Sequence, residues 1–331
     1  MYSNNNRPLN LKLKKNHTLL RVLTYHRVAE IEPPVILDPA MISATPVGFA
    51  RQMQYLSNNY NVISMRDLID AAENRAALPE RPVLITFDDA YHDFLEYAWP
   101  VLKDLKLPAT VFVSTAHAAK PEELFWWDKI SNAFLNTTRK KIDLAPLGPL
   151  MLKNTGERRK NLKKVKNYLK TLDHNIAMSL VDELYSCLKG IKAEIKVSLD
   201  WDELRQLHSQ GITLAAHTRT HPILSRISAE DARKEIIGSQ KDLERETGDV
   251  LPVFCYPNGD YNDLIIQILK DAGFVMAFST KDGHNDLDCI NPFCLRRTNL
   301  TLRTSMPVFQ LRLLKIGGFI DSLRHRSFMT A

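Results

Sequence analysis

Short apolar segments alternate with amphipathic ones along most of this chain, and that alternation restricts the folds it can adopt. Seven segments have strand length, are rich in β-branched and aromatic residues, and end at turn or helix-start signals. They are Leu20–Tyr25, Val83–Phe87, Ala109–Ser114, Ile212–Ala216, Val253–Tyr256, Val275–Ser279 and Leu295–Asn299, with a weaker candidate at Asn61–Ser64. Helices between such strands return the chain to the same edge of a sheet, so the strands run parallel. The pattern predicts an α/β fold built on a parallel sheet or barrel.

Two of the intervening helices have clear signals of their own. The segment Phe49–Asn58 places its apolar residues on one stripe, as a helix that covers a sheet does. Ser228 followed by Asp231 is typical of a capped helix start, and Gly248 is a typical helix stop.

Residues from about 122 to 197 interrupt this alternation. The block opens with the aromatic cluster Phe125–Trp127 and continues into a basic helical run, Glu157–Leu172. A second helical stretch covers Ile176–Leu188. We interpret the block as a helical insertion in an α/β domain that spans residues 20–300.

The two ends of the chain differ from the domain between them. Residues 1–19 contain little apolar material and predict a flexible N-terminal arm. Residues 301–331 interleave apolar and basic residues and predict an amphipathic, basic helical segment. Such a segment can lie on a membrane surface, but it is more often a terminal helix packed on its own domain. We favour the second interpretation.

Composition narrows the choice of partners. The 331 residues carry a formal net charge of +6, which indicates either anionic partners, such as phosphorylated lipid head groups and glycans, or a solvated basic surface. The basic residues form no recognisable nucleic-acid-binding module, so we expect no nucleic-acid partner. Four cysteines in a chain of this length do not form a disulfide scaffold. The first twenty residues contain no apolar stretch of signal-peptide length, which predicts a cytoplasmic protein, with peripheral contact at the inner face of the membrane as an option.

Two adjacent carboxylates, Asp88 and Asp89, follow the apolar strand candidate Val83–Phe87 directly. Adjacent residues on a regular strand point to opposite faces, but where the chain turns at a strand end both can line one cleft. The alternative is a helix N-cap and its first-turn neighbour, because Asp suits both positions.

Two histidines, His217 and His221, follow the strand candidate Ile212–Ala216. A spacing of four places them on one face of a helical turn, close enough to share an ion. Pro222 would keep that loop rigid. A lone histidine is more often structural, whereas a pair at this spacing after a buried strand indicates a ligand set.

Three further polar groups follow predicted strands: Tyr25–Arg27, the turn Tyr256–Asp260, and the pair Arg296–Arg297. Each alone is explained by turn chemistry or by a structural role. Together with the aspartates and histidines they occupy the carboxyl ends of parallel strands, the edge at which barrels and open α/β sheets build their sites.

This set of residue types suits hydrolysis of an amide or ester. One Asp and two His leave open positions on a divalent ion such as Zn²⁺, which lowers the pKa of a bound water. A second Asp can take a proton from that water, and backbone N–H groups can stabilise an oxyanion. A histidine on the opposite side can protonate the leaving amine.

Two sequence motifs resemble those of a known family. Thr86-Phe-Asp-Asp-Ala-Tyr91 resembles the first motif, TFDDG-(Y/F/P), of polysaccharide deacetylases with the NodB homology domain (carbohydrate esterase family 4). His217-Thr-Arg-Thr-His-Pro222 matches the second, H-(S/T)-x-x-H-P, and Phe254–Gly259 resembles a third motif of the form F-x-Y-P-x-G. The resemblance covers about residues 20–300 outside the insertion, and it implies a distorted (β/α) barrel.

The resemblance also implies roles for individual residues. Asp89, His217 and His221 would hold the metal, which is zinc in the first instance, with cobalt, nickel, iron or manganese as alternatives. Asp88 would be the catalytic base, and the backbone N–H of Asn258 would serve the oxyanion. Residues expected to bind substrate or support this set are Tyr25, Tyr91, Thr218, Tyr256, Pro257, Arg296, Arg297 and Trp127.

Three departures from the family pattern matter. Ala90 replaces a glycine, which a turn tolerates if φ stays negative. The arginine that many members carry in the third motif falls on Cys255, and Arg296 or Arg297 would supply its charge from another strand. No Leu-x-x-His motif follows near the C-terminus. Because one branch of the family carries a Tyr-His dipeptide on its first strand, His26 is the expected general acid, with a core or supporting histidine as the alternative.

The family acts on N-acetyl groups of glucosamine-type sugars. For this chain the resemblance predicts a polysaccharide, oligosaccharide or lipid-linked glycan substrate in surface-polysaccharide biosynthesis. Two other readings stay open: a non-catalytic glycan-binding protein on the same fold, and a deformylase or other amide hydrolase. The sequence does not predict the oligomeric state.

Overall fold

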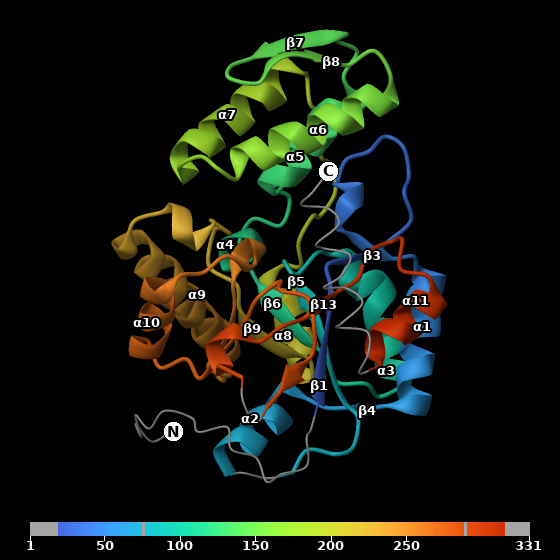
Figure 1. Ribbon diagram of the computed structural model, residues 1–331, viewed down its shortest axis with the longest axis vertical. Coiled ribbons are helices and arrows are strands. Elements are labelled where there is room, and N and C mark those ends of the chain that lie inside the picture. Colours follow the sequence, from blue (N-terminus) through green and yellow to red (C-terminus); the bar gives the residue numbers. More distant parts are fainter. Residues whose placement is uncertain (1–18, 75–76, 288–289, 315–331) are drawn as a thin grey trace.

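A curled sheet of parallel strands forms the centre of the computed structural model, which describes residues 19–74, 77–287 and 290–314 (Figure 1). In spatial order its main strands are β11 (Met276–Phe278), β10 (Val253–Cys255), β9 (Thr213–Ala216), β6 (Thr110–Val113), β5 (Pro82–Asp88) and β1 (Leu19–Tyr25). Two short strands extend it, β4 (Asn61–Val62) beside β5 and the antiparallel β12 (Asn285–Asp286) beside β1. The predicted strands are therefore present and parallel.

The segment from Leu295 to Asn299 joins the two edges of this sheet. Leu295 forms a parallel backbone bridge with Phe278 of β11, and β13 (Thr298–Asn299) pairs in parallel with β1. The sheet thereby closes into the distorted (β/α) barrel that the sequence predicts.

Strand alternation sorts the barrel's side chains into two layers. One set, which includes Val22, Leu84 and Phe112, fills the interior, and α2 (Met65–Asn74) closes its lower end. The other set points outward against helices that surround the barrel. These are α1 (Pro46–Asn59), α3 (Trp99–Asp104), α8 (Trp201–Ser209), α9 (Ala229–Thr247), α10 (Asp263–Asp271) and α11 (Met306–Leu313), with a π-helical turn at Phe94–Ala98 before α3.

Local signals set the ends of α9 as expected. The Ser228 hydroxyl accepts a hydrogen bond from the backbone N–H of Asp231, which satisfies a donor at the helix start. Gly248 ends the helix at a φ of 80°, a conformation that glycine adopts without strain.

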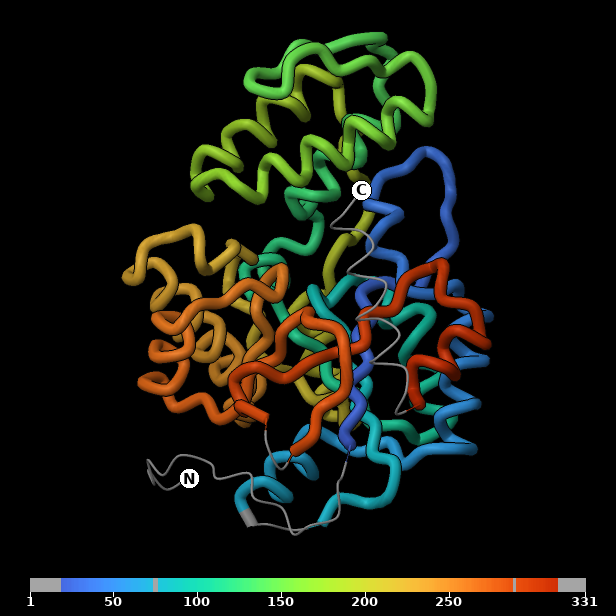
Figure 2. Tube along the Cα trace, in the orientation of Figure 1, coloured from blue at the N-terminus to red at the C-terminus, as the bar shows by residue number. Residues whose placement is uncertain are grey.

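A separate layer of structure, called the upper layer below, stands over the carboxyl ends of the barrel strands (Figures 1 and 2). It follows the short helix α4 (Thr115–Ala118) and consists of α5 (Trp126–Asn136), the hairpin β7 (Lys141–Leu144) and β8 (Gly148–Met151), α6 (Thr155–Leu169) and α7 (His174–Cys187). These elements bury a core of their own, which includes Phe134, Leu162 and Val165. The hairpin was not expected. Its turn depends on Gly148 at a φ of 72°, a weak signal in a Pro-containing stretch.

Both ends of this layer pass through one neck. In this neck, the backbone N–H groups of Val197 and Ser198 donate to the carbonyl of Pro121. These hydrogen bonds join the segment that leaves the barrel to the segment that returns to it. Ser198 also forms a bridge with Tyr91, beside the two aspartates. The neck therefore fixes the layer next to the strand ends that carry the polar residues. A small sheet of β2 (Arg27–Val28) and β3 (Ile42–Ala44) lies nearby.

The described part of the C-terminal segment packs on the barrel. Phe309 and Leu313 of α11 are buried in the outer layer, and the Phe309 ring lies 6.3 Å from that of Tyr55 on α1. Residues 315–331 and residues 1–18 of the predicted arm lie outside the described part of the chain. Among the described residues no helix has the length and apolarity needed to cross a membrane.

Candidate active site

The polar residues singled out in the sequence meet at the carboxyl end of the barrel. Asp88 ends β5 and Asp89 follows it, while His217 follows β9. The loops here are unusual in backbone conformation. Of the eight non-glycine residues with positive φ in the described ranges, five lie at these strand ends. They are Asp89, Ala90, Thr218, His221 and Asn258. Such conformations cost about 1 kcal/mol or more each and concentrate at functional sites.

Asp89, His217 and His221 form a buried donor set. The Asp89 Oδ1 atom lies 3.5 Å from His217 Nε2 and 3.3 Å from His221 Nε2. The two imidazole centroids are 4.8 Å apart. All three ligand atoms lie within 4.8 Å of one another, a spacing that one ion can bridge.

The helical turn predicted between the histidines is wrong. Thr218 and His221 have φ angles of 64° and 59°, so the segment is an irregular loop. The Thr218 hydroxyl accepts a hydrogen bond from the His221 N–H at 3.0 Å, which holds the loop in this conformation. Thr218 thus supports the histidine loop, as the family motif implies, by a geometry that a spacing of four does not reveal.

The donor set fits a divalent cation. Among the described residues Asp89 Oδ1 is buried and has no hydrogen-bond partner. His217 Nδ1 donates to the Cys255 carbonyl at 2.7 Å, which leaves Nε2 available toward Asp89. Burial raises the pKa of Asp89, but His221 and His217 outweigh it and keep that pKa below its usual value. A buried, ionised carboxylate with two imidazole nitrogens is the ligand chemistry of zinc and similar ions.

Asp88 is held by a buried arginine. Arg297 Nη1 and Nη2 donate to the two carboxylate oxygens of Asp88, each at 2.7 Å, and both side chains are almost fully buried. Burial alone would raise the pKa of Asp88, but this bidentate ion pair lowers it well below the usual range. Asp88 is therefore an ionised carboxylate at neutral pH, oriented from below by a guanidinium.

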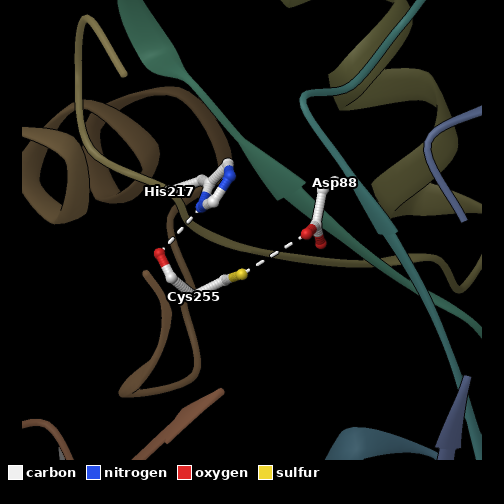
Figure 3. A group of neighbouring side chains, drawn as sticks. All are labelled: Asp88, His217 and Cys255. Atoms are coloured by element: carbon white, nitrogen blue, oxygen red, sulfur yellow. Dashed lines mark hydrogen bonds between the residues drawn. The ribbon is translucent and has the colours of Figure 1, made fainter. Parts of the chain in front are cut away.

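A second group of donors, Asp88, His217 and Cys255, also converges (Figure 3). The Cys255 thiol points toward Asp88, with Sγ at 3.6 Å from Oδ2. Burial raises the pKa of this thiol, so it is protonated near neutral pH, and Arg297 already occupies Asp88. This group is therefore a hydrogen-bonded support, whereas the Asp89 group is the candidate metal site.

Strand alternation decides between the two candidate arginines. Leu295 belongs to the barrel interior, so Arg297, two residues on, also points inward, whereas Arg296 points out. Arg296 Nη1 donates to the Asp282 carbonyl at 3.2 Å, away from Asp88. Arg297 therefore supplies the charge, and the prediction for Arg296 is wrong.

By the same alternation, two tyrosines that were expected to bind substrate or support the site point to the outer face of the barrel. Tyr25 lies on the outer face of β1, where it is fully buried and its hydroxyl donates to Gln52 Oε1 at 2.8 Å. Tyr256 is buried likewise, with its hydroxyl donating to the Phe293 carbonyl at 3.0 Å. Neither can contact a substrate, because both rings pack between the barrel and its helices. Pro257, also buried, starts the turn that carries Asn258.

His26 and Asn258 lie in the segments that follow β1 and β10. His26 Nε2 lies 4.0 Å from Asp88 Oδ2, and a quarter of the His26 side chain is exposed. Asn258 sits at a φ of 57° in the turn after β10. Its Oδ1 accepts a hydrogen bond from Lys170 Nζ at 2.5 Å, a contact from the upper layer that the sequence did not suggest.

Ala90 corrects another expectation. Its φ is 53°, so the position does adopt the left-handed conformation that favours the glycine of the family motif. The strain is tolerated because the Ala90 carbonyl accepts the Leu199 N–H at 2.9 Å, which ties the turn to the neck.

Tyr91 and Trp127 form a support behind the metal ligands. Trp127 Nε1 donates to the Tyr91 hydroxyl at 2.6 Å, and that hydroxyl donates to Asp128 Oδ2 at 2.8 Å. The Trp127 ring lies 4.6 Å from the His221 ring. Both rings are buried and cannot stack on a sugar; Trp127 packs against His221, and Tyr91 accepts the hydrogen bond that holds Trp127. Asp128 was not identified from the sequence.

Asp128 gives the fold a pH-dependent element. Burial raises the pKa of Asp128 to about 7, although the Asp38 N–H donates to it at 2.6 Å. The Asp128 carboxyl group therefore holds its proton more strongly in the folded state than in the unfolded state. The stabilisation that results is full below pH ~4 and is lost as the pH rises toward 7.

Replacing Asp128 by Asn should therefore remove this dependence. The free energy of unfolding of the variant minus that of the wild type is expected to rise between pH 4 and 7, by up to about 4 kcal/mol at ~1.4 kcal/mol per pKa unit, and then to level off. Urea unfolding at a series of pH values measures it. A difference that stays constant with pH would contradict the assignment.

Comparison with known proteins agrees with this geometry. The sequence model of the polysaccharide deacetylase family matches residues 75–137 and 148–277, more than half of the chain. The poly-β-1,6-N-acetyl-D-glucosamine N-deacetylase of Staphylococcus epidermidis is 33% identical over 116 residues, which are 32% of this chain and 39% of that protein. The aligned part thus spans about two fifths of that relative. The Bacillus subtilis protein YxkH is 20% identical over 277 residues, or 83% of this chain and 70% of YxkH.

Solved structures show the same fold. The deacetylase PplD of Streptococcus pyogenes superposes with a TM-score of 0.62 at 17% identity, covering 90% of this chain and 99% of PplD. IcaB from Ammonifex degensii gives a TM-score of 0.57 at 18% identity, covering 90% and 98%. Fold and site thus define a barrel protein with a candidate metal site at its strand ends. The chain belongs to the polysaccharide deacetylase family.

Proposed function

We propose that this chain hydrolyses N-acetyl groups on amino sugars of a polysaccharide, oligosaccharide or lipid-linked glycan, with a divalent metal, first of all zinc, as its cofactor. The observation that carries the proposal is the convergence of Asp89, His217 and His221 beside an ion-paired Asp88. The names of the staphylococcal relatives support an N-acetylglucosamine substrate. A role in surface-polysaccharide biosynthesis and a cytoplasmic location stay predictions from the sequence.

In this proposal, one residue of the chain accepts a proton from water and another donates a proton to the leaving amine. When bound, the metal would polarise the amide carbonyl and lower the pKa of the attacking water. Asp88, kept ionised by Arg297, accepts the proton of that water. His26 lies on the more exposed side of Asp88 and protonates the leaving amine. The backbone N–H of Asn258 donates to the oxyanion as the amide carbon becomes tetrahedral.

Product analysis separates the proposed activity from its alternatives. The protein is incubated with Zn²⁺ and a β-1,6-linked N-acetylglucosamine oligomer, and released acetate and free amines are counted. We expect equal amounts of both, and none from protein treated with a chelator. Formate release from an N-formyl analogue without acetate release would favour a deformylase. Binding of the oligomer without any release would favour a glycan-binding protein.

Replacing His26 by Gln tests the proton donor. We expect kcat for an N-acetyl amide to fall about 100-fold, while hydrolysis of an activated phenyl ester falls much less, because a phenolate leaves without a proton. His208→Gln, on α8 away from the site, is the matched control. Equal losses on amide and ester would show that His26 supports the structure instead.

A further inference from the structure

The corner between α6 and α7 covers a small cavity beside the candidate metal site. The cavity is lined by the metal ligand His221, by Trp126, Lys170 and His174 of the upper layer, and by Arg226 of the loop that follows the histidines, together with apolar side chains such as Met178. Figure 1 shows the upper layer standing over this end of the barrel. A group bound in the cavity would therefore lie next to the reacting amide.

The cations of this cavity lack acidic partners. In the described ranges no carboxylate lies within 4.0 Å of Lys170 or of Arg226, whereas Lys166, in the last turn of α6, pairs with Asp38. The one hydrogen-bond acceptor found for Lys170 Nζ is the neutral amide oxygen of Asn258. Asp260, the nearest acid along the turn, accepts instead from Asn258 Nδ2 at 2.6 Å.

Burial of the Lys170 side chain makes it unfavourable to keep its ammonium group without an acidic partner. Burial, with the nearby Lys166, lowers the pKa of Lys170, and the attraction of Asp260 and Asp38 from beyond ion-pair distance offsets only part of this effect. A half-buried cation without a counterion is stabilised when an anion enters. The lysines of α6, which ends at Leu169 just before Lys170, do not share this setting. Lys163, for example, is exposed and does not line the cavity.

We propose that this cavity is a subsite for an anionic group, phosphate or carboxylate, carried by the amino-sugar substrate. Lys170 and Arg226 bind the anion, and the half-buried Trp126 ring offers a face to the attached sugar. The inference rests on the proposed deacetylase function and specifies its substrate class. The cavity is only about 20 Å³ in this arrangement, so the α6–α7 corner must move outward to admit the group. An anion that replaces Asn258 as the partner of Lys170 releases the bond that holds the corner down.

Three substrates distinguish the possible sources of the anion. They are the neutral β-1,6-linked N-acetylglucosamine disaccharide, its 1-phosphate, and its aldonic acid, which carries a carboxylate at the same end. We expect kcat/KM of the wild-type protein to be about tenfold or more higher for an anionic form, mainly through KM. A preference for the phosphate alone identifies phosphate as the ligand, and a preference for both assigns a general anion site.

Two variants test the residues. The ratio of kcat/KM between anionic and neutral substrates should fall toward one in Lys170→Gln and in Arg226→Gln, and stay unchanged in the exposed control Lys163→Gln. Equal rates of the wild type on all three substrates would overturn the inference. A loss in Lys170→Gln that is the same for every substrate would also overturn it, because Lys170 would then only tether the corner to Asn258.

A direct binding measurement keeps this test separate from that of the proposed function. Calorimetric titration of the intact protein with the 1-phosphate and with the neutral disaccharide should show tighter binding of the phosphate, which weakens in Lys170→Gln. Turnover of none of the substrates, with that binding difference present, contradicts the deacetylase function alone. Turnover without any preference for an anion contradicts the subsite alone.

Discussion

Replacing Asp88 by Asn is expected to reduce deacetylation by about three orders of magnitude while metal binding persists. Asn keeps an oxygen that accepts from Arg297, but it cannot take a proton from the attacking water. The proposed metal donors Asp89, His217 and His221 form a group that does not include Asp88. Acetate release and metal content of the purified variant are the two measurements.

The control for this variant is Asp263→Asn, which removes an exposed carboxylate at the start of α10 without touching Asp88, the proposed metal donors or Asn258. Its acetate release should stay within severalfold of the wild type. Turnover by Asp88→Asn at more than a tenth of the wild-type rate would show that another group is the base. Loss of the metal along with activity would instead place Asp88 in the donor set.

Replacing Arg297 by Met is expected to destabilise the fold by about 3–5 kcal/mol, because it leaves the Asp88 carboxylate buried without a partner. Activity of the folded fraction should fall as well. Without the guanidinium, burial raises the pKa of Asp88, so the base is protonated at a higher pH than in the wild type. Chemical unfolding and the pH profile of kcat measure the two effects.

Arg296→Met is a matched control, since it removes the same charge one residue away on the exposed side. It should change stability by about 0.5 kcal/mol or less. The double variant Cys255→Arg, Arg297→Met places an arginine where many relatives carry it, and it should recover part of the lost stability. If Arg297→Met unfolds like the wild type, the ion pair is not the support that its geometry indicates.

The position of the site followed from the sequence because parallel strands bring their carboxyl ends to one edge. Asp88 and His217 each directly follow a predicted strand, and Asp89 follows Asp88, so the proximity of these three residues was predictable. The sequence also contained enough information to choose Arg297 over Arg296 as the partner of Asp88. Leu295 is apolar and faces the interior, and a period of two then places Arg297 inward. The same rule applied to Tyr25 and Tyr256 would have removed them from the cleft.

Other parts of the site had no sequence signal strong enough to predict them. The loop between His217 and His221 depends on left-handed backbone at Thr218, which a Thr rarely adopts and which only the surrounding contacts impose. The contact of Lys170 with Asn258 joins residues 88 positions apart, through an upper layer whose placement depends on tertiary packing. Asp128 is one acid among many until its burial against Tyr91 is known.

These observations give the upper layer a place in the chemistry as well as in the fold. Trp127 packs against His221, and Lys170 donates to Asn258, whose backbone N–H is the proposed donor to the oxyanion. A barrel without this layer would keep the proposed metal donors but lose the contact of Trp127 with His221. The layer is therefore expected to set which glycans reach the metal.

The central claim is that one metal, held by Asp89, His217 and His221, enables the hydrolysis. The most direct test is to titrate metal-free protein with Zn²⁺ while acetate release from the oligomer is followed. The rate should rise in proportion to added metal and level off at one equivalent per chain, and His221→Ala should bind no metal tightly and stay inactive. Full acetate release by protein shown to be free of metal, in the presence of a chelator, would contradict the account.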